Sequence, residues 1–319
     1  MPVLVLGGSG HLGRHAVAAL LARGQAVRVL TRSAWAARAL LGPEPELVEG
    51  DLEDPVAVRA AFDGVERAVV AISAFTLGTF RRLGAIERDA VIAALTAGRD
   101  QGLRRVVYLS VFAVDGPQAA DLETAQVKRA VEAWLAGSGL DWTVLGQPPS
   151  TDLFFALIRA GRVLVAPGGG PPALPTISPL DTGALVALAV LRDDLGGRRL
   201  RLVGPDRPSF PEVARRIGAA WGRRLRVVKP PLLVFRALHR LSGWLAPRLD
   251  LAGYAHLLLG HILLMRRFPQ DLAARAGDDH ATLRALFPTW EPRPLEDDAR
   301  RISTPAPAPP RGSSGPGSP

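Results

Sequence analysis

The stretch from Met1 to Ser33, MPVLVLGGSGHLGRHAVAALLARGQAVRVLTRS, decides the fold. A uniformly apolar run at 3–6 predicts a buried strand, and residues 12–23 place apolar side chains at helical spacing. A second apolar run follows at 26–30. Between the first run and the helix lie three glycines: Gly7, Gly10 and Gly13. This order of strand, glycine turn, helix and strand predicts the beginning of a parallel α/β sheet.

The three glycines of this turn meet different steric demands. Gly7 lets the chain turn sharply after the strand, Gly10 lets backbone amides approach a diphosphate, and Gly13 lets the helix pack closely. A phosphate bound here would lie at the helix N-terminus, where unpaired amides and the helix dipole favour negative charge. The turn therefore predicts a site for the pyrophosphate of a nicotinamide dinucleotide.

The second strand ends in VLTRS, and no acidic residue occurs between positions 25 and 43. An acid at this point would accept hydrogen bonds from the ribose 2′-hydroxyl of NAD, whereas Arg32 suits a 2′-phosphate. The sequence therefore favours NADP over NAD, with Arg14 as a second candidate contact. A solvated surface role for Arg32 stays open, because arginine is so abundant in this chain.

Strand and helix patterns continue to alternate as far as residue 148. The expected strands lie at 46–51, 67–72, 104–110 and 141–145, and the expected helices at 55–62, 83–101 and 123–137. Such alternation predicts a parallel sheet with helices on both faces. Because crossovers are right-handed, a doubly wound Rossmann α/β sheet is the simplest topology.

The pattern changes after Gln147, where loops rich in proline and glycine separate short helices. We therefore expect an NAD(P)-binding Rossmann domain over 1–148 and a smaller, mostly helical substrate or partner domain over 149–302. Residues 303–319, STPAPAPPRGSSGPGSP, cannot build a core and are expected to be a disordered tail.

Two elements of the second part have recognisable starts. Asp181 is expected to cap a helix over 182–191, and Ser209 with Glu212 forms a capping-box pattern that opens a helix over 211–221. The strand expected over 198–204 and the helix that follows it are candidates to pack back on the Rossmann sheet.

Composition excludes several classes of protein. The 319-residue chain has no cysteine, so disulfides, thiolate metal sites and cysteine nucleophiles are excluded. No signal peptide is visible, and the longest apolar stretch, 251–265, is shorter than the roughly 20 residues that span a membrane. We therefore expect a cytoplasmic protein.

The net charge of +9 is unevenly placed. Residues 223–248 carry seven basic side chains and no acidic one. In the helix expected over 232–246, Arg236 and Arg240 share a side, while an apolar stripe is expected at Phe235, Leu238, Leu241 and Leu245. Such a helix fits either a plain cationic surface or a docking face for anionic lipid or an acidic partner. No module for reading nucleic acid is recognisable.

Several motifs occur in an order that is typical of one superfamily. They are GGSGHLGR, VLTRS, GDLED, VVYLS, a helix with Glu123 and Lys128, and SGLDWTVL followed by a proline. The chain resembles the atypical short-chain dehydrogenase/reductase superfamily, and most closely its NmrA-like and isoflavone-reductase-like NAD(P)-binding branch, which includes an accessory subunit of respiratory complex I. The resemblance extends over 1–148, weakens over 175–228 and ends there.

The resemblance implies a cofactor site built from the ends of successive strands. It implies phosphate contacts at Gly7, Ser9, Gly10, His11, Leu12 and Gly13, a 2′-phosphate contact at Arg32, and adenine contacts at Asp51 and Leu52. It implies ribose contacts at Ala71, Ile72 and Ser73, with Ser110 and Lys128 near the nicotinamide. Gln147 and Pro148 stand where the family usually has an Arg-Pro pair, and the resemblance implies a cofactor contact there. Asp51 can also cap the helix that begins near Pro55.

The usual acid/base pair of short-chain dehydrogenases is missing. That pair is a tyrosine four residues before a lysine, where the ammonium lowers the pKa of the phenol. Here Thr124 lies four residues before Lys128, and its hydroxyl is too weak an acid. Lys128 is a candidate catalytic or ribose-holding residue, with a solvated helix lysine as the alternative. His256 and His261 are five residues apart, so no metal site is expected there.

Two functions follow from these residues. The first is an NADPH-dependent reductase of a small carbonyl- or quinone-like substrate, with Lys128 and Ser110 at the reacting centre. The second is a non-catalytic NAD(P)H-binding redox sensor or accessory subunit that docks through the basic segment 223–248.

Overall fold

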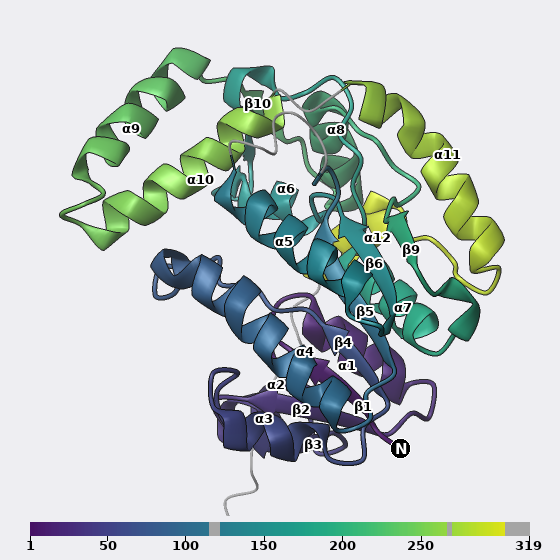
Figure 1. The fold of residues 1–319 in the computed structure, drawn as a ribbon. Coiled ribbons are helices and arrows are strands. Elements are labelled where there is room, and N and C mark those ends of the chain that lie inside the picture. The colour runs from purple at the N-terminus through teal and green to yellow at the C-terminus, as the bar shows by residue number, and fades with distance from the viewer. Residues whose placement is uncertain (115–121, 267–269, 304–319) are drawn as a thin grey trace, which may run out of the picture.

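The computed structural model describes residues 1–114, 122–266 and 270–303, excluding the side chains of 264–266, 270–275 and 303. Its central feature is a seven-stranded sheet in the order β3-β2-β1-β4-β5-β6-β9, in which every pair of neighbours is parallel (Figure 1). The strands are β1 Val3–Leu6, β2 Val27–Thr31, β3 Glu46–Glu49, β4 Arg67–Val70, β5 Arg105–Val111, β6 Asp141–Gln147 and β9 Arg198–Arg201. This order confirms the predicted doubly wound α/β fold.

Helices cover both faces of the sheet. They are α1 Gly13–Leu21, α2 Ala34–Leu41, α3 Pro55–Phe62, α4 Val91–Asp100, α5 Glu123–Gly137 and α7 Pro179–Val190. Side chains of β1 alternate between the faces: Val3 and Val5 pack with α1 and α7, whereas Leu4 and Leu6 pack with α3, α4 and α5. Both faces are therefore buried, which explains why the strands are almost uniformly apolar.

The segment after β4 differs from the single helix expected over 83–101. A short 3-10 turn, η1 Phe80–Arg82, comes first, and a π-helix, η2 Ala85–Ala90, then leads directly into α4. Isolated π-turns are rare and often accompany functional sites. The helices expected over 55–62 and 123–137 agree with the observed bounds of α3 and α5.

Apart from α7 and β9, the elements after β6 lie outside the main sheet and its covering helices, and we call them the second layer. It contains α6 Asp152–Ala156, η4 Pro167–Gly169, η5 Asp193–Leu195, α8 Phe210–Ala220, α9 Leu232–Leu245, α10 Asp250–Arg266, α11 Gln270–Leu286 and α12 Leu295–Ser303. A small sheet in the order β10-β8-β7 joins β7 Ile158–Arg159, β8 Val163–Val165 and β10 Arg226–Val228. Strand β9 returns to the main sheet by pairing with β6. No helix of the described residues is long and apolar enough to cross a membrane.

Asp181 does not cap a helix, contrary to expectation. Helix α7 begins earlier, because Pro179 suits its first turn and the Ser178 hydroxyl accepts a hydrogen bond from the backbone N–H of Leu180. Asp181 is instead buried and pairs with Arg293. Ser209 caps α8 as predicted. The predicted tail lies outside the described residues after Ser303.

Candidate functional site

The glycine turn lies where β1 and β4 are neighbours, the point at which the order of strands reverses. Gly7 has a φ of +82°, and a Cβ there would lie 2.6 Å from the backbone oxygen of Ala71. A Cβ on Gly13 would overlap the backbone oxygen of Gly7, and the Gly10 N–H donates to that same oxygen at 2.9 Å. Larger residues at Gly7 and Gly13 would therefore break the turn.

The N-terminus of α1 has no side-chain cap. Its N-cap residue is Leu12, which has no side chain able to accept, and the first turn carries no acid. By contrast, Ser33 caps α2 and Asp54 caps α3 through side-chain oxygens. An uncapped helix start next to a glycine turn is suited to an anion, because its amides lack internal partners.

Gly8 contributes to the turn in a way that the sequence analysis missed. A Cβ on Gly8 would lie 2.8 Å from Cγ1 of Val29 in β2, so the turn can approach the second strand only with glycine there. The run GG at the end of the first strand was the available signal.

Arg32 follows β2 directly and is exposed, without a hydrogen-bond or ion-pair partner among the residues that the structure describes. The carboxylate of Glu49, however, lies at the same end of the sheet, because β2 and β3 pair Thr31 with Glu49. Glu49 accepts a hydrogen bond from the backbone N–H of Ala34 at 3.1 Å. The sequence analysis missed Glu49 because it lies outside the stretch from 25 to 43. Only the pairing of β3 with β2 brings it to the end of β2.

Asp51 and Leu52 are half-buried after β3. Asp51 accepts from the backbone N–H of Glu53 at 3.0 Å. The cap of α3 is Asp54, whose side chain accepts from the N–H of Val56 at 2.9 Å, so the expected capping role of Asp51 is wrong. The reason is position: Asp54 directly precedes the Pro55 that starts the helix.

Lys128 is buried at the carboxyl end of β4, so the alternative of a solvated lysine is wrong. Its Nζ donates to the backbone oxygen of Ile72 at 2.9 Å and pairs with Oε2 of Glu87 at 2.7 Å. Glu87 is also buried, and its other oxygen accepts from the backbone N–H of Ala74. The pair thus joins α5, the π-helix η2 and the segment after β4. Ser73, in that segment, is exposed.

Glu87 is a candidate site residue that the sequence analysis missed. Leu83, Glu87 and Val91 are spaced four residues apart, and all three are buried. A lone acid on an otherwise apolar helical face was therefore a signal for a buried charge that needs a partner.

Ser110 is buried and donates to Oε1 of Glu132, one turn after Lys128 on α5. The other oxygen of Glu132 pairs with Arg199 of β9 at 2.9 Å. The hydroxyl of Ser110 is therefore held in a network between α5 and the sheet edge. The ring of Tyr108 lies beside Lys128, with its centroid 5.3 Å from Nζ.

Tyr108 cannot replace the missing phenol. Its side chain is fully buried, and burial, together with the carboxylates of Glu87 and Glu132, raises the pKa of its hydroxyl well above the ordinary value. The other tyrosine, Tyr254, lies on α10, and its hydroxyl contacts the backbone oxygen of Phe75 at 3.4 Å.

Gln147 and Pro148 lie at the carboxyl end of β6. Oε1 of Gln147 accepts from the Thr182 hydroxyl at 2.9 Å, and this bond fixes the amide orientation. Nε2 of Gln147 is buried without a hydrogen-bond partner among the described residues. A buried amide donor of this kind is suited to an oxygen of a bound molecule, because leaving it unpaired costs free energy.

His11 ties the glycine turn to the second layer. Its Nε2 lies 2.8 Å from Oδ2 of Asp152 at the start of α6. Burial opposes the charge on Asp152, but hydrogen bonds from His11 and Ser150 outweigh it and lower the pKa of Asp152. The turn is therefore covered from one side by the residue that opens α6.

The two histidines of α10 are not brought together. His256 stacks on His239 of α9 with ring centroids 3.8 Å apart. His261 instead lies against the ring of Phe75 at 4.7 Å and contacts the hydroxyl of Thr124 at 3.2 Å. Helix α10 therefore packs over the segment that follows β4.

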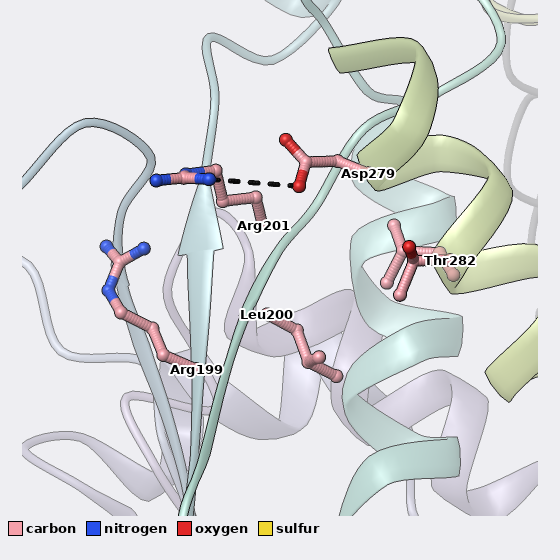
Figure 2. Close-up of a pocket in the computed structure, with 6 residues that line it drawn as sticks. Arg199, Leu200, Arg201, Asp279 and Thr282 are labelled. Carbon is pink, nitrogen blue, oxygen red and sulfur yellow. Dashed lines mark ion pairs between the residues drawn. The ribbon is translucent and has the colours of Figure 1, made fainter. Parts of the chain in front are cut away.

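A separate cavity of about 180 Å³ opens between β9 and α11 (Figure 2). It is lined by Arg199, Leu200, Arg201, Asp279, Thr282 and Leu283. Arg201 and Asp279 lie side by side at its wall, with 3.8 Å between Nη1 of Arg201 and Oδ1 of Asp279. Since β9 lies three strands from β4 and typical ligand pockets hold about 300 Å³ or more, this cavity is not the dinucleotide site.

The chain is similar to known proteins over most of its length. A family model described as NAD(P)H-binding matches residues 7–190. The (4-alkanoyl-5-oxo-2,5-dihydrofuran-3-yl)methyl phosphate reductase of Streptomyces griseus is 31% identical over 229 residues, which are 70% of this chain and 75% of that protein. Sterol demethylase protein B of Methylococcus capsulatus is 35% identical over 156 residues, which are 48% of this chain and only 42% of that protein.

A solved structure shows the same fold. The NADPH-dependent quinone oxidoreductase of Escherichia coli, in complex with NADPH, matches with a TM-score of 0.72 over 95% of this chain and 100% of that chain. The sequences are 19% identical, so the likeness concerns the fold alone.

Proposed function

The chain belongs to the NAD(P)H-binding family, as its motifs predicted, and we propose that it is an NADPH-dependent reductase of a small carbonyl- or quinone-like substrate. The relative from Streptomyces griseus is a reductase, and the structural neighbour from Escherichia coli is an NADPH-dependent quinone oxidoreductase. These likenesses support the reaction class.

The residues around the reversal of strand order fit a nicotinamide dinucleotide. The glycine turn and the uncapped start of α1 would hold its diphosphate, and the exposed Arg32 would hold a 2′-phosphate. Asp51 would accept from the adenine amino group. Once bound, the cofactor supplies the hydride, and the chain itself has to orient the substrate and stabilise the charge on its oxygen.

One observation carries the proposal: an ammonium group is buried beside the carboxyl end of β4. Lys128 has three N–H donors, and Glu87 and the backbone oxygen of Ile72 account for two of them. The third would bind a ribose hydroxyl or the substrate oxygen, where a preorganised positive charge stabilises developing negative charge. The unpaired Nε2 of Gln147 would add a second donor.

The test is NADPH oxidation with a panel of quinones and aldehydes, comparing the wild type with Lys128→Met. Loss of a catalytic donor lowers turnover by about 100-fold or more. Lys229→Met is the matched control, because Lys229 is the other lysine of the chain and is exposed. Its turnover should stay unchanged. Wild-type protein that binds NADPH but reduces no member of the panel would contradict the reductase proposal.

A second candidate function is a non-catalytic NAD(P)H-binding sensor or accessory subunit. The observation that favours it is the ion pair itself, because Glu87 neutralises Lys128 and Tyr108 is sealed in the core. Such a protein would bind NADPH tightly and reduce none of the quinones or aldehydes. Its affinity for a binding partner would differ between the NADPH-bound and the free form. Reductase turnover that depends on Lys128 would exclude it.

A further inference from the structure

Helices α9 and α10 form an arm at the upper left of the molecule, with α9 outermost (Figure 1). The inner side of α9 packs on α10, where His239 stacks on His256 and Ser242 is buried. In the usual case a helix of this position would turn a polar side outward, because its apolar stripe faces the core.

The outer side of α9 is apolar instead. Leu233, Leu241 and Trp244 are 74%, 53% and 66% exposed. At about 100° per residue, the exposed apolar side chains of α9 fall within an arc of about 140°. They are Leu233, Val234, Leu238, Leu241 and Trp244. Of the stripe expected from the sequence, Leu238 and Leu241 are exposed, whereas Phe235 and Leu245 are half-buried.

The charge beside this apolar face has one sign. Residues 223–249 carry seven basic side chains and no acidic one. Arg236 and Arg240 are exposed along one edge of the face, and the guanidinium of Arg248 lies 5.5 Å from the ring centroid of Trp244. The next acid, Asp250, is paired with Arg81 at 2.6 Å.

We propose that the outer face of α9 docks on the surface of an anionic lipid bilayer. A helix that combines leucine and tryptophan on one side with arginine at its edge lies in the interface, with its apolar side chains among the acyl chains. The arginines then meet anionic headgroups, each contributing electrostatic attraction. This mode requires no helix that spans the membrane.

Other occupants of the face fit less well. A second copy in a two-fold dimer would bring the same arginines against each other, because such an interface is formed by the same patch on both subunits. Residues 304–319 contain no leucine, isoleucine, valine or aromatic residue, so their sequence offers nothing to fill an apolar face.

Docking would place the candidate site close to the lipid. Tyr254 and His261, on the side of α10 that faces the molecule, contact the ring of Phe75. Phe75 lies three residues after Ile72, whose backbone oxygen accepts a hydrogen bond from Lys128. The arm is thus a two-helix layer between the proposed bilayer surface and the end of β4. Docking itself does not depend on reductase activity and can fail or succeed independently of it.

The test is co-sedimentation of the full chain with vesicles of phosphatidylcholine alone and of phosphatidylcholine mixed with phosphatidylglycerol. Wild type should sediment with the mixed vesicles only, and raising the salt from about 0.1 M to about 1 M should release it. Arg236→Glu with Arg240→Glu should weaken binding at least about 30-fold, at about fivefold per arginine removed. Leu238→Ser with Trp244→Ser, which keeps the charge, should weaken it about tenfold or more.

The matched control is Arg59→Glu with Arg198→Glu, which changes the charge equally on exposed positions of α3 and β9. This control should bind like the wild type, and circular dichroism should show that all variants fold. If the control and the α9 charge variant lost vesicle binding to the same extent, the effect would come from net charge alone and the proposal would be overturned. Wild type that does not sediment with the mixed vesicles would also overturn the proposal. If this wild type formed a dimer that Leu241→Glu abolished, the face would instead be an interface between two copies of the chain.

Discussion

Lys128 and Glu87 form a buried ion pair at the carboxyl end of β4, with Nζ and Oε2 2.7 Å apart. The pair connects α5 to the π-helix that precedes α4, and both partners also bind backbone groups of the segment after β4. It therefore fixes the position of that segment relative to the glycine turn, as well as placing an ammonium group there.

The pair makes a direct prediction about stability. Lys128→Met leaves the Glu87 carboxylate buried without its cation, so the free energy of unfolding should fall by about 3–5 kcal/mol. Lys128→Met combined with Glu87→Leu removes the unpaired charge and should recover part of that loss. Urea unfolding measures both, with Lys229→Met expected within about 0.5 kcal/mol of wild type. Additive losses in the double variant would show that the two side chains do not interact.

The glycine turn makes a second prediction. Gly13→Ala places a Cβ against the backbone oxygen of Gly7, which cannot move without disturbing β1. We expect a loss of at least about 2 kcal/mol in the free energy of unfolding, together with loss of NADPH binding. Gly137→Ala is the control, because its Cβ meets nothing within 4 Å at the end of α5, and it should be neutral or stabilising by up to about 1 kcal/mol. A fully stable Gly13→Ala protein with normal affinity would contradict the observed turn.

His15 predicts a loss of stability in mild acid. Burial, followed by the charges of Arg14, Arg301 and His11, lowers the pKa of His15 from 6.5 to about 4. Between these values the unfolded chain binds a proton that the folded chain does not, so stability falls as pH drops from 6.5 to 4 and is unaffected above 6.5. Because His15 is half-exposed, screening limits the loss to about 1 kcal/mol.

The measurement is urea unfolding of wild type and His15→Gln at several pH values across this window. The variant should lose less stability than the wild type between pH 6.5 and 4, and other titrating groups cancel in the difference. Parallel curves for the two proteins would show that His15 titrates normally in the folded chain.

The sequence predicted the parts of the fold that depend on local pattern. Gly7, Gly10 and Gly13 lie between a buried strand and an amphipathic helix, and each of these signals is contained in a single short stretch. The alternation of strands and helices, with right-handed crossovers, predicted a doubly wound parallel sheet, and the observed sheet confirms it.

The residues that were missed reach the site through contacts between distant segments. Glu49 arrives at the end of β2 through strand register, and Glu87 reaches Lys128 through a π-helix that periodicity cannot distinguish from an α-helix. The side of α9 that meets α10 was also not predictable, because an apolar stripe in the sequence does not show whether it packs inward or stays exposed. In the structure the side with His239 and Ser242 packs on α10.

We propose that the turn between β1 and α1 binds the diphosphate of NADPH and that Arg32 binds its 2′-phosphate. The direct measurement is a calorimetric titration of NADPH and of NADH into the wild type and into Arg32→Ala. We expect wild type to prefer NADPH by at least about tenfold, or about 1.4 kcal/mol, and the variant to lose most of that preference while keeping its affinity for NADH. Absence of heat with both nucleotides, or equal affinity for the two in wild type, would contradict this account.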